Sequence, residues 1–211
     1  MQRIIVVLTL LMLTGMHGHA NKWDFLTESG SGDISFGTRN AISMFNDIHG
    51  ESRGIGIGGQ TRVQFSDRIN TEWFLDYITS TIGKKAVRND YHVGWSLMYY
   101  LNKNSGFDKF LKPYLIAGHC FDYTEVFAKA DKNYGKSRLS MATQAGIGNH
   151  FNITRQLDFS ISAQYMLHFG KEIEAYDKRE GNLVIEEAEY SSAIGHLLAV
   201  FSINYKFAKL W

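Results

Sequence analysis

The side chains best suited to metal binding or proton transfer in this chain are five histidines: His92, His119, His150, His168 and His196. Ligands of structural zinc sites commonly come in short pairs such as Cys-x2–4-Cys or His-x3–5-His. No two of these five histidines are that close in the sequence. We therefore expect structural histidines, and predict that the chain has no metal ligand, no cofactor and no catalytic residue.

A serine hydrolase site needs a serine, a histidine and a carboxylate that orients the histidine. Ser192 and His196 would share one face of a strand, since strand side chains alternate between faces. The sequence places no carboxylate to orient His196 or His168. The spacing therefore predicts that the protein is not an enzyme.

A glycine-rich run, Gly54-Ile-Gly-Ile-Gly-Gly59, superficially resembles a phosphate-binding loop. Such a loop lies between a strand and a helix. Here the following residues, Gln60–Phe65, have the pattern of a strand. We interpret the glycines as small residues on the inner face of a strand, under bulky neighbours.

The strand that best defines the fold is the last one, within residues 192–207. From position 197 every second residue is apolar: Leu197, Ala199, Phe201, Ile203, Tyr205 and Phe207. This period of two indicates a strand with one apolar face. Little sequence follows that could cover the terminal aromatics, whereas lipid would cover them and aromatics mark the edge of the hydrocarbon layer. The pattern predicts that this strand closes an outer-membrane β-barrel.

Eight stretches of this kind are predicted, at 33–46, 54–65, 69–80, 90–101, 112–123, 138–151, 157–168 and 192–207. The connections at 66–68 and 152–156 are short, and the one at 102–111 is compact. The others, at 47–53, 81–89, 124–137 and 169–191, include the two longest and most charged. Short inner turns and long outer loops are typical of outer-membrane barrels. The fold class is therefore predicted as all-β, an eight-stranded antiparallel up-and-down transmembrane barrel.

The alternation also predicts which residues face the lumen. The predicted lumenal residues are Gln60, Arg62, Gln64, Glu72, Phe74, Asp76, His92, Met98, Tyr100, Gln164 and Met166. The turn at 66–68 would set Arg62 opposite Glu72 as a buried ion pair, and the turn at 152–156 would set His150 opposite Asp158. The strands at 33–46 and 112–123 show no clear facing. An eight-stranded barrel is just wide enough for its own side chains, so an open pore is not expected.

The chain begins with features of a secretory signal. Arg3 precedes an apolar run, Ile4–Leu13, and small residues lie before Asn21. A run of ten residues is too short to span a bilayer as a helix. We expect a cleaved signal peptide at 1–20 and a barrel domain at 21–211.

The overall charge and the cysteine count exclude several classes. Without Arg3 the chain holds 21 basic and 21 acidic residues, so nothing in the balance suggests nucleic acid. The single cysteine, Cys120, allows no intramolecular disulfide. One proline against 20 glycines fits long uninterrupted strands.

Several motifs resemble small outer-membrane barrels. Lys112-Pro-Tyr-Leu-Ile-Ala-Gly118 is similar to the Pro-Tyr-x-x-x-Gly strand common in them, and Gln144-Ala-Gly-Ile-Gly148 and the Tyr-x-Phe ending are also similar. The whole mature chain resembles the eight-stranded OmpA/OmpX/OmpW-like and opacity-protein-like group. The family usually stops on its terminal aromatic, whereas here Ala208–Trp211 follow Phe207. Either Phe207 or Trp211 could therefore be the terminal aromatic.

This resemblance implies a cell outer membrane protein with an envelope structural, surface-interaction or small-molecule-conduit role. The partners it implies are outer-membrane lipid and lipopolysaccharide, the barrel-assembly machinery at the C-terminal strand, and an extracellular ligand at the loops. Basic residues around 83–89 (Lys84, Lys85 and Arg88) suggest contact with lipopolysaccharide phosphates, and the acidic loop 170–190 suggests cations or a partner.

Two alternatives remain open from the sequence. One is a lipid A-modifying barrel enzyme similar to acyloxyacyl hydrolases, although the His-x-Ser-Asn pattern of that barrel type is absent at His168 and His196. The other is a soluble, lipocalin-like binding barrel, in which the bulky apolar face would turn inward.

Overall fold

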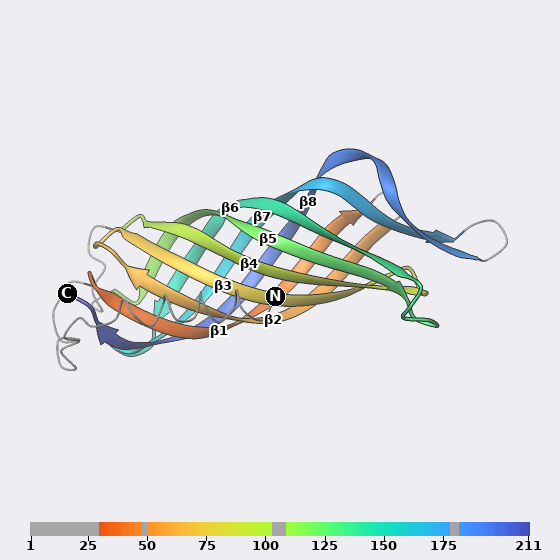
Figure 1. Cartoon of the computed structure of the whole chain (residues 1–211). Helices are drawn as coiled ribbons and strands as arrows, with labels where there is room; N and C mark the ends of the chain where they lie inside the picture. Colours follow the sequence, from red (N-terminus) through yellow and green to blue (C-terminus); the bar gives the residue numbers. More distant parts are fainter. Residues whose placement is uncertain (1–29, 48–49, 103–108, 178–181) are drawn as a thin grey trace, which may run out of the picture.

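The computed structural model of the chain is a closed antiparallel barrel in which each strand pairs with the next and β8 pairs with β1 (Figure 1). It describes residues 30–47, 50–102, 109–177 and 182–211. The strands are β1 (Asp33–Asp47), β2 (Gly50–Gln64), β3 (Ile69–Ile82), β4 (Ala86–Tyr100), β5 (Leu111–Ala128), β6 (Gly135–Asn152), β7 (Leu157–Asp177) and β8 (Leu183–Lys209). The predicted all-β, eight-stranded fold is confirmed. The predicted signal peptide lies outside the described residues.

The two ends of the barrel differ. The start of β1, the end of β8, the turns at 65–68 and 153–156, the end of β4 and the start of β5 lie at one end, which we call the terminal end. The end of β1, the start of β2, the turns at 83–85 and 129–134, the end of β7 and the start of β8 lie at the other, the hairpin end. Figure 1 shows the β7–β8 hairpin extending beyond the rest of the barrel at the hairpin end.

The strands at the hairpin end are longer than the sequence pattern predicted. Residues 169–177 and 183–191 belong to β7 and β8, and 86–89 belong to β4, so the predicted charged loops are largely strand. This prediction was wrong because charge was taken as a sign of loop. Apolar inner residues of these extensions pack together, as Ile173, Ala175 and Ile185 do with Val126. Outward charges are compatible with strand pairing wherever water faces the outer side.

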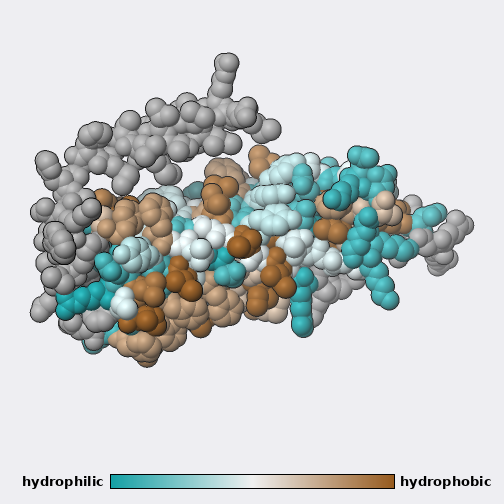
Figure 2. Space-filling model, turned by 90° about the horizontal axis from the view of Figure 1, so that it is seen from below, coloured by the Kyte–Doolittle hydropathy of each residue, from teal (hydrophilic) through white to brown (hydrophobic). Residues whose placement is uncertain are grey.

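The predicted facing of the strands is confirmed. All eleven predicted lumenal residues are buried, and bulky apolar side chains lie on the outside, as Ile55, Leu75 and Val93 do. In Figure 2 apolar side chains gather over the barrel wall, whereas hydrophilic ones cover the hairpin end on the right. This facing is opposite to that of a soluble binding barrel, which contradicts the lipocalin-like alternative. Thr71 is an exception, because it was expected outside and is buried.

Aromatic side chains border the apolar band on both sides. Toward the hairpin end, the rings of Tyr77, Tyr91 and Tyr123 form a row, with centroids 5.1 and 6.1 Å apart. Toward the terminal end, Tyr99 lies on the outer face of β4, eight positions from Tyr91. Eight residues of a strand tilted by ~40° span about 21 Å of height. This is close to the ~25 Å apolar band of outer-membrane barrels.

Both candidate terminal aromatics lie at the terminal end. Phe207 belongs to β8, at a register shift in the pairing with β1, and its ring stacks on Phe36 at 4.8 Å. Trp211 lies past the strand, with its ring 6.0 Å from Phe65 and its indole N–H donating to Ser31 Oγ at 3.1 Å. Phe207 is therefore the last aromatic of the barrel wall, and Trp211 covers its edge.

Three apolar clusters fill parts of the lumen. One lies near the terminal end around Met98 and Tyr100, one in the middle around Phe74 and Met166, and one at the hairpin end around Val126. Polar side chains occupy the space between them. In the part of the chain that the structure describes, no helix is long and apolar enough to cross a membrane.

Candidate functional site

A network of buried ion pairs joins four strands inside the barrel. Glu72 of β3 accepts from Arg62 Nε and from Arg39 Nη1, both at 2.8 Å. Arg39 Nε lies 2.9 Å from Asp76, and Arg62 Nη1 lies 3.2 Å from Asp158 of β7. The register prediction that set Arg62 opposite Glu72 is confirmed. Arg39, on a strand whose facing the sequence did not assign, is an addition from the structure.

Glycine makes room for this network on β2. A Cβ atom on Gly58 would lie 2.1 Å from Asp76 Oδ1 and 3.1 Å from Arg39 Cγ. Side chains at neighbouring positions, Gly54 and Gly56, would meet Ile78 in the same way. The glycine run therefore serves lumenal packing, as predicted, and a strand follows it in place of the helix that a phosphate loop requires.

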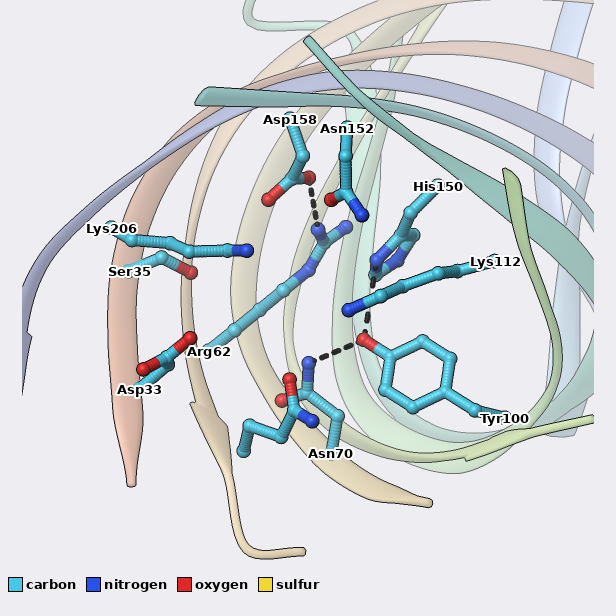
Figure 3. Close-up of a pocket in the computed structure, with 11 residues that line it drawn as sticks. Asp33, Ser35, Arg62, Asn70, Tyr100, Lys112, His150, Asn152, Asp158 and Lys206 are labelled. Carbon is cyan, nitrogen blue, oxygen red and sulfur yellow. Dashed lines mark hydrogen bonds and ion pairs between the residues drawn. The ribbon is translucent and has the colours of Figure 1, made fainter. Parts of the chain in front are cut away.

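At the terminal end the lumen narrows to a polar mouth (Figure 3). Asn70 Nδ2 donates to the Tyr100 hydroxyl at 2.8 Å, and this hydroxyl lies 3.2 Å from His150 Nδ1. The Lys112 ammonium lies 5.3 Å from the centre of the Tyr100 ring. The cavity between these groups has a volume of about 10 Å³, which is about enough for one water molecule. The mouth is thus filled by side chains.

The predicted partner of His150 was wrong. His150 lies opposite Ser160, and Asn152 lies opposite Asp158. The Ile153 N–H also donates to the Leu157 carbonyl at 2.9 Å, so only three residues, 154–156, separate the last pair in place of the five expected. The Thr154 hydroxyl closes this turn by accepting from the Leu157 N–H at 2.9 Å. The actual register differs from the predicted one by two residues. A shift of two leaves every side chain on its predicted face and changes only its partner.

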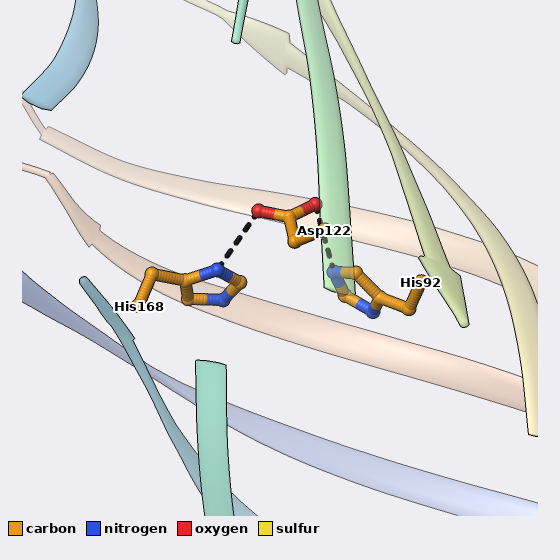
Figure 4. Close-up of side chains that lie close together, drawn as sticks. All are labelled: His92, Asp122 and His168. Atoms are coloured by element: carbon orange, nitrogen blue, oxygen red, sulfur yellow. Dashed lines mark ion pairs between the residues drawn. The ribbon is translucent and has the colours of Figure 1, made fainter. Parts of the chain in front are cut away.

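A second polar cluster lies nearer the hairpin end, where His92 of β4, Asp122 of β5 and His168 of β7 meet (Figure 4). His92 Nε2 lies 3.4 Å from Asp122 Oδ1, and His168 Nδ1 lies 2.8 Å from Asp122 Oδ2. All three side chains are at most 1% exposed. His196 of β8 is also buried, with its ring centroid 4.9 Å from that of His168. We call these four residues the histidine–aspartate cluster.

Hydroxyl groups hold the carboxylate of this cluster in place. Ser140 Oγ donates to Asp122 Oδ2 at 3.1 Å. The Thr124 hydroxyl lies 3.1 Å from the same oxygen, and its single proton is shared with the nearer Asp90 Oδ1 at 2.7 Å. Arg138 Nη2 lies 4.0 Å from the same oxygen. The cluster thus has carboxylate and imidazole groups on rigid paired strands, with supporting donors around the carboxylate, which is an arrangement able to bind a proton or a metal ion.

This cluster contradicts one sequence expectation. No carboxylate was expected to orient a histidine, yet Asp122 contacts both His168 and His92. Close spacing was the signal sought, whereas each residue comes from a different strand. The side chain of Ser192, the predicted companion of His196, lies outside the described side chains. His119 faces outward beside Trp95, with ring centroids 5.4 Å apart, and is separate from the cluster.

Exposed lysines gather on two adjacent hairpins of the hairpin end. Lys84 and Lys85 lie in the β3–β4 turn, and the Lys129 N–H donates to the Lys85 carbonyl at 2.8 Å across to the β5–β6 turn. Lys132 and Lys136 line a surface hollow of about 440 Å³ beside them. We call these five residues the lysine cluster. Arg88, predicted as part of a basic loop, instead lies in the lumen and forms an ion pair with Asp90 at 3.0 Å.

Comparison with known proteins supports the fold. No protein-family profile and no curated protein sequence matches the chain. Neisserial surface protein A is similar in structure, with a TM-score of 0.58, 13% identity and coverage of 82% of this chain and 97% of that one. The outer membrane protein OprG from Pseudomonas aeruginosa gives a TM-score of 0.53 at 14% identity, with coverage of 84% and 96%. Ail, the attachment invasion locus protein of Yersinia pestis, gives 0.50 at 14% identity, with coverage of 84% and 99%. The chain has the fold of small eight-stranded outer-membrane barrels.

Proposed function

We propose that the protein is a non-conducting, non-enzymatic barrel of the cell outer membrane that presents its hairpin end as an interaction surface outside the cell. One observation carries this proposal: a closed barrel with an apolar outer band encloses a lumen filled by side chains. An outer surface of this kind needs lipid as its solvent. A filled lumen leaves the outer end as the surface available for contact with other molecules.

The orientation follows from the two ends of the barrel. Outer-membrane barrels have short periplasmic turns, and their longer connections lie outside. The connections are no shorter at the terminal end, but at the hairpin end the paired strands run past the tyrosine row before they turn, farthest in β7 and β8. These longer extensions place the hairpin end outside the cell and the terminal end in the periplasm. In this orientation the C-terminal strand, with Tyr205 and Phe207, is the part that the barrel-assembly machinery would bind.

Reconstitution tests the proposal directly. The refolded protein should show heat-modifiable gel mobility in detergent, and should give no steady single-channel conductance in planar bilayers, because ion pairs and apolar clusters fill the lumen. A stable conductance that scales with bulk salt would contradict the closed lumen. A protein that stays folded and monomeric without detergent would contradict the membrane location.

The lysine cluster indicates the chemistry of a contact surface. Its five ammonium groups lie beyond the tyrosine row that marks the edge of the apolar band. At this height, lipopolysaccharide phosphates are the anionic groups available in an outer leaflet, and surface charges attract over about one Debye length. We therefore propose lipopolysaccharide as the partner of this cluster.

A triple substitution tests this partner. Lys129→Gln, Lys132→Gln and Lys136→Gln together should reduce the amount of lipopolysaccharide that copurifies with the barrel, and should weaken the salt dependence of binding. The matched control is Lys209→Gln at the terminal end, which should retain the wild-type amount. Equal retention by the triple variant and the wild type would argue against lipopolysaccharide contact at these lysines.

A further inference from the structure

We propose that the histidine–aspartate cluster binds a divalent transition-metal ion, with His92, Asp122 and His168 as ligands and His196 as a fourth. This inference goes beyond the proposed function and does not depend on it. Three imidazoles and one carboxylate form a donor set that suits Zn²⁺ and its first-row neighbours. Oxygen-rich sites for Ca²⁺ or Mg²⁺ have a different composition.

The distances within the cluster fit an ion at its centre. One ligand atom from each of His92, Asp122 and His168 can be chosen so that all three lie within 4.8 Å of one another. Two ligands of a tetrahedral ion, each bound at ~2.1 Å, lie about 3.4 Å apart. His92 Nε2 and Asp122 Oδ1 already have this separation, at 3.4 Å. Side-chain movements of about 1 Å would therefore complete a three-ligand site.

His196 is placed to complete the coordination. Its ring centroid lies 4.9 Å from that of His168 and 6.1 Å from that of His92. It comes from β8, so the four ligands would join β4, β5, β7 and β8 across the lumen. An ion bound here would link the β4–β5 pair to the β7–β8 pair across the lumen.

Unsatisfied polar atoms provide an independent reason to expect a ligand. The ring nitrogens that would bind the ion, His92 Nε2 and His168 Nδ1, are buried and lie near Asp122, but they make no hydrogen bond of good geometry with any described residue. Buried ring nitrogens in native proteins are normally paired with protein, water or an ion. Each of these inner nitrogens would bind the ion through its lone pair while the ring proton sits on the outer nitrogen, His92 Nδ1 or His168 Nε2, so each imidazole stays neutral and no oxidant or reductant is needed.

The surroundings support the carboxylate without blocking it. Ser140 donates to Asp122 Oδ2, which leaves Oδ1 directed toward His92. Such supporting hydrogen bonds orient metal ligands and often change metal affinity by about 10–100-fold. Arg138, at 4.0 Å from Oδ2, competes for the same oxygen, but its Nη1 already donates to the Lys171 carbonyl at 2.6 Å. The positive charge is therefore held at the side of the cluster.

Titration of the purified wild-type barrel with Zn²⁺ in detergent tests the site. We expect one Zn²⁺ per barrel, and expect Asp122→Asn and His168→Gln to weaken binding by at least ~100-fold, since even supporting residues account for 10–100-fold. The control is His150→Gln, which removes a buried lumenal histidine at the terminal end and should bind like wild type. Equal binding by all these variants, or no binding by the wild type, would overturn the proposal.

Two further measurements distinguish loss of the site from misfolding of a variant and from slow entry of the ion. The wild type should bind Co²⁺ with the strong visible absorption of a four-coordinate site, and a spectrum like that of the hydrated ion would overturn the proposal. Metal should be added both after folding and during refolding. Binding under either condition supports the site, and its absence under both contradicts it.

Discussion

Glu72→Ala should produce one of the largest losses of stability of any single substitution in the barrel. Glu72 is 3% exposed and accepts from both Arg39 and Arg62. Its removal leaves two buried guanidinium groups with fewer partners. Breaking a buried ion pair by removing one member typically costs about 3–5 kcal/mol, because the other charge remains buried.

The two arginines keep different partners in this variant. Arg39 retains Asp76 at 2.9 Å, and Arg62 retains Asp158 at 3.2 Å. These remaining pairs, and any water that enters the space, reduce the loss toward the lower end of the range. The measurement is the free energy of unfolding from denaturant titration in detergent.

A matched control distinguishes the effect of removing a buried, paired glutamate from the effect of removing any glutamate. Glu187→Ala removes an exposed glutamate on β8 and should change the free energy of unfolding by less than ~0.5 kcal/mol. Glu72→Gln, which keeps the shape and loses the charge, should also be destabilised. A Glu72→Ala barrel as stable as the control would show that the lumen is hydrated and that the ion pairs contribute little.

Leu97→Arg should destabilise the barrel through its outer surface. Leu97 is 43% exposed on the outer face of β4, between Tyr91 and Tyr99. We infer that these tyrosines mark the two edges of the hydrocarbon layer. An arginine on the lipid face costs about 2–4 kcal/mol at the bilayer midplane and less toward the interfaces. Leu97 lies two residues from Tyr99, between the midplane and the interface, so we expect a loss of about 1–2 kcal/mol for folding in lipid vesicles.

Thr81→Arg is the control for this substitution. Thr81 is exposed on β3 beyond the tyrosine row, where water or headgroups would surround it, so arginine should be tolerated there. A comparable loss in both variants would point to local strand effects. No loss in either would place the apolar band outside the hydrocarbon layer and contradict the membrane location.

The sequence determined the strand number, the faces of β2, β3, β4, β7 and β8, and one lumenal ion pair. These features depend on local alternation, since a residue's face is set by its parity along the strand. The turn between β2 and β3 is short enough that its length also set the register, so Arg62 was correctly placed opposite Glu72. At the β6–β7 turn the same method failed, because alternation does not distinguish registers that differ by two residues.

The faces of β1 and β5 were decided only by the tertiary structure, and each of these strands holds a central residue of the site. Arg39 lies on β1 and Asp122 on β5. On β5 the outward residues include His119, and the lumenal ones include Ile116 and Cys120. Apolar side chains of β5 pack inside the lumen, and a histidine lies on its outer face beside Trp95. The two faces of β5 therefore differ too little in polarity to show which one points into the lumen.

The strand extensions show the same limit of local patterns. Residues 172–176 of β7 alternate in part, with Ile173 and Ala175 buried, but their charge suggested a loop. Only the pairing with β8 shows that the lumenal side continues as an apolar core beyond the membrane band.

The histidine–aspartate cluster shows most clearly what closure of the barrel adds. The sequence spaces His92, Asp122 and His168 far apart, and each strand taken alone shows only a lumenal polar residue. Their meeting depends on the closed sheet, in which β4 and β7 face each other across a lumen narrow enough for side chains to touch. Alternation along a strand therefore determines that a side chain points inward, whereas the number of strands and their registers determine which other side chains it meets.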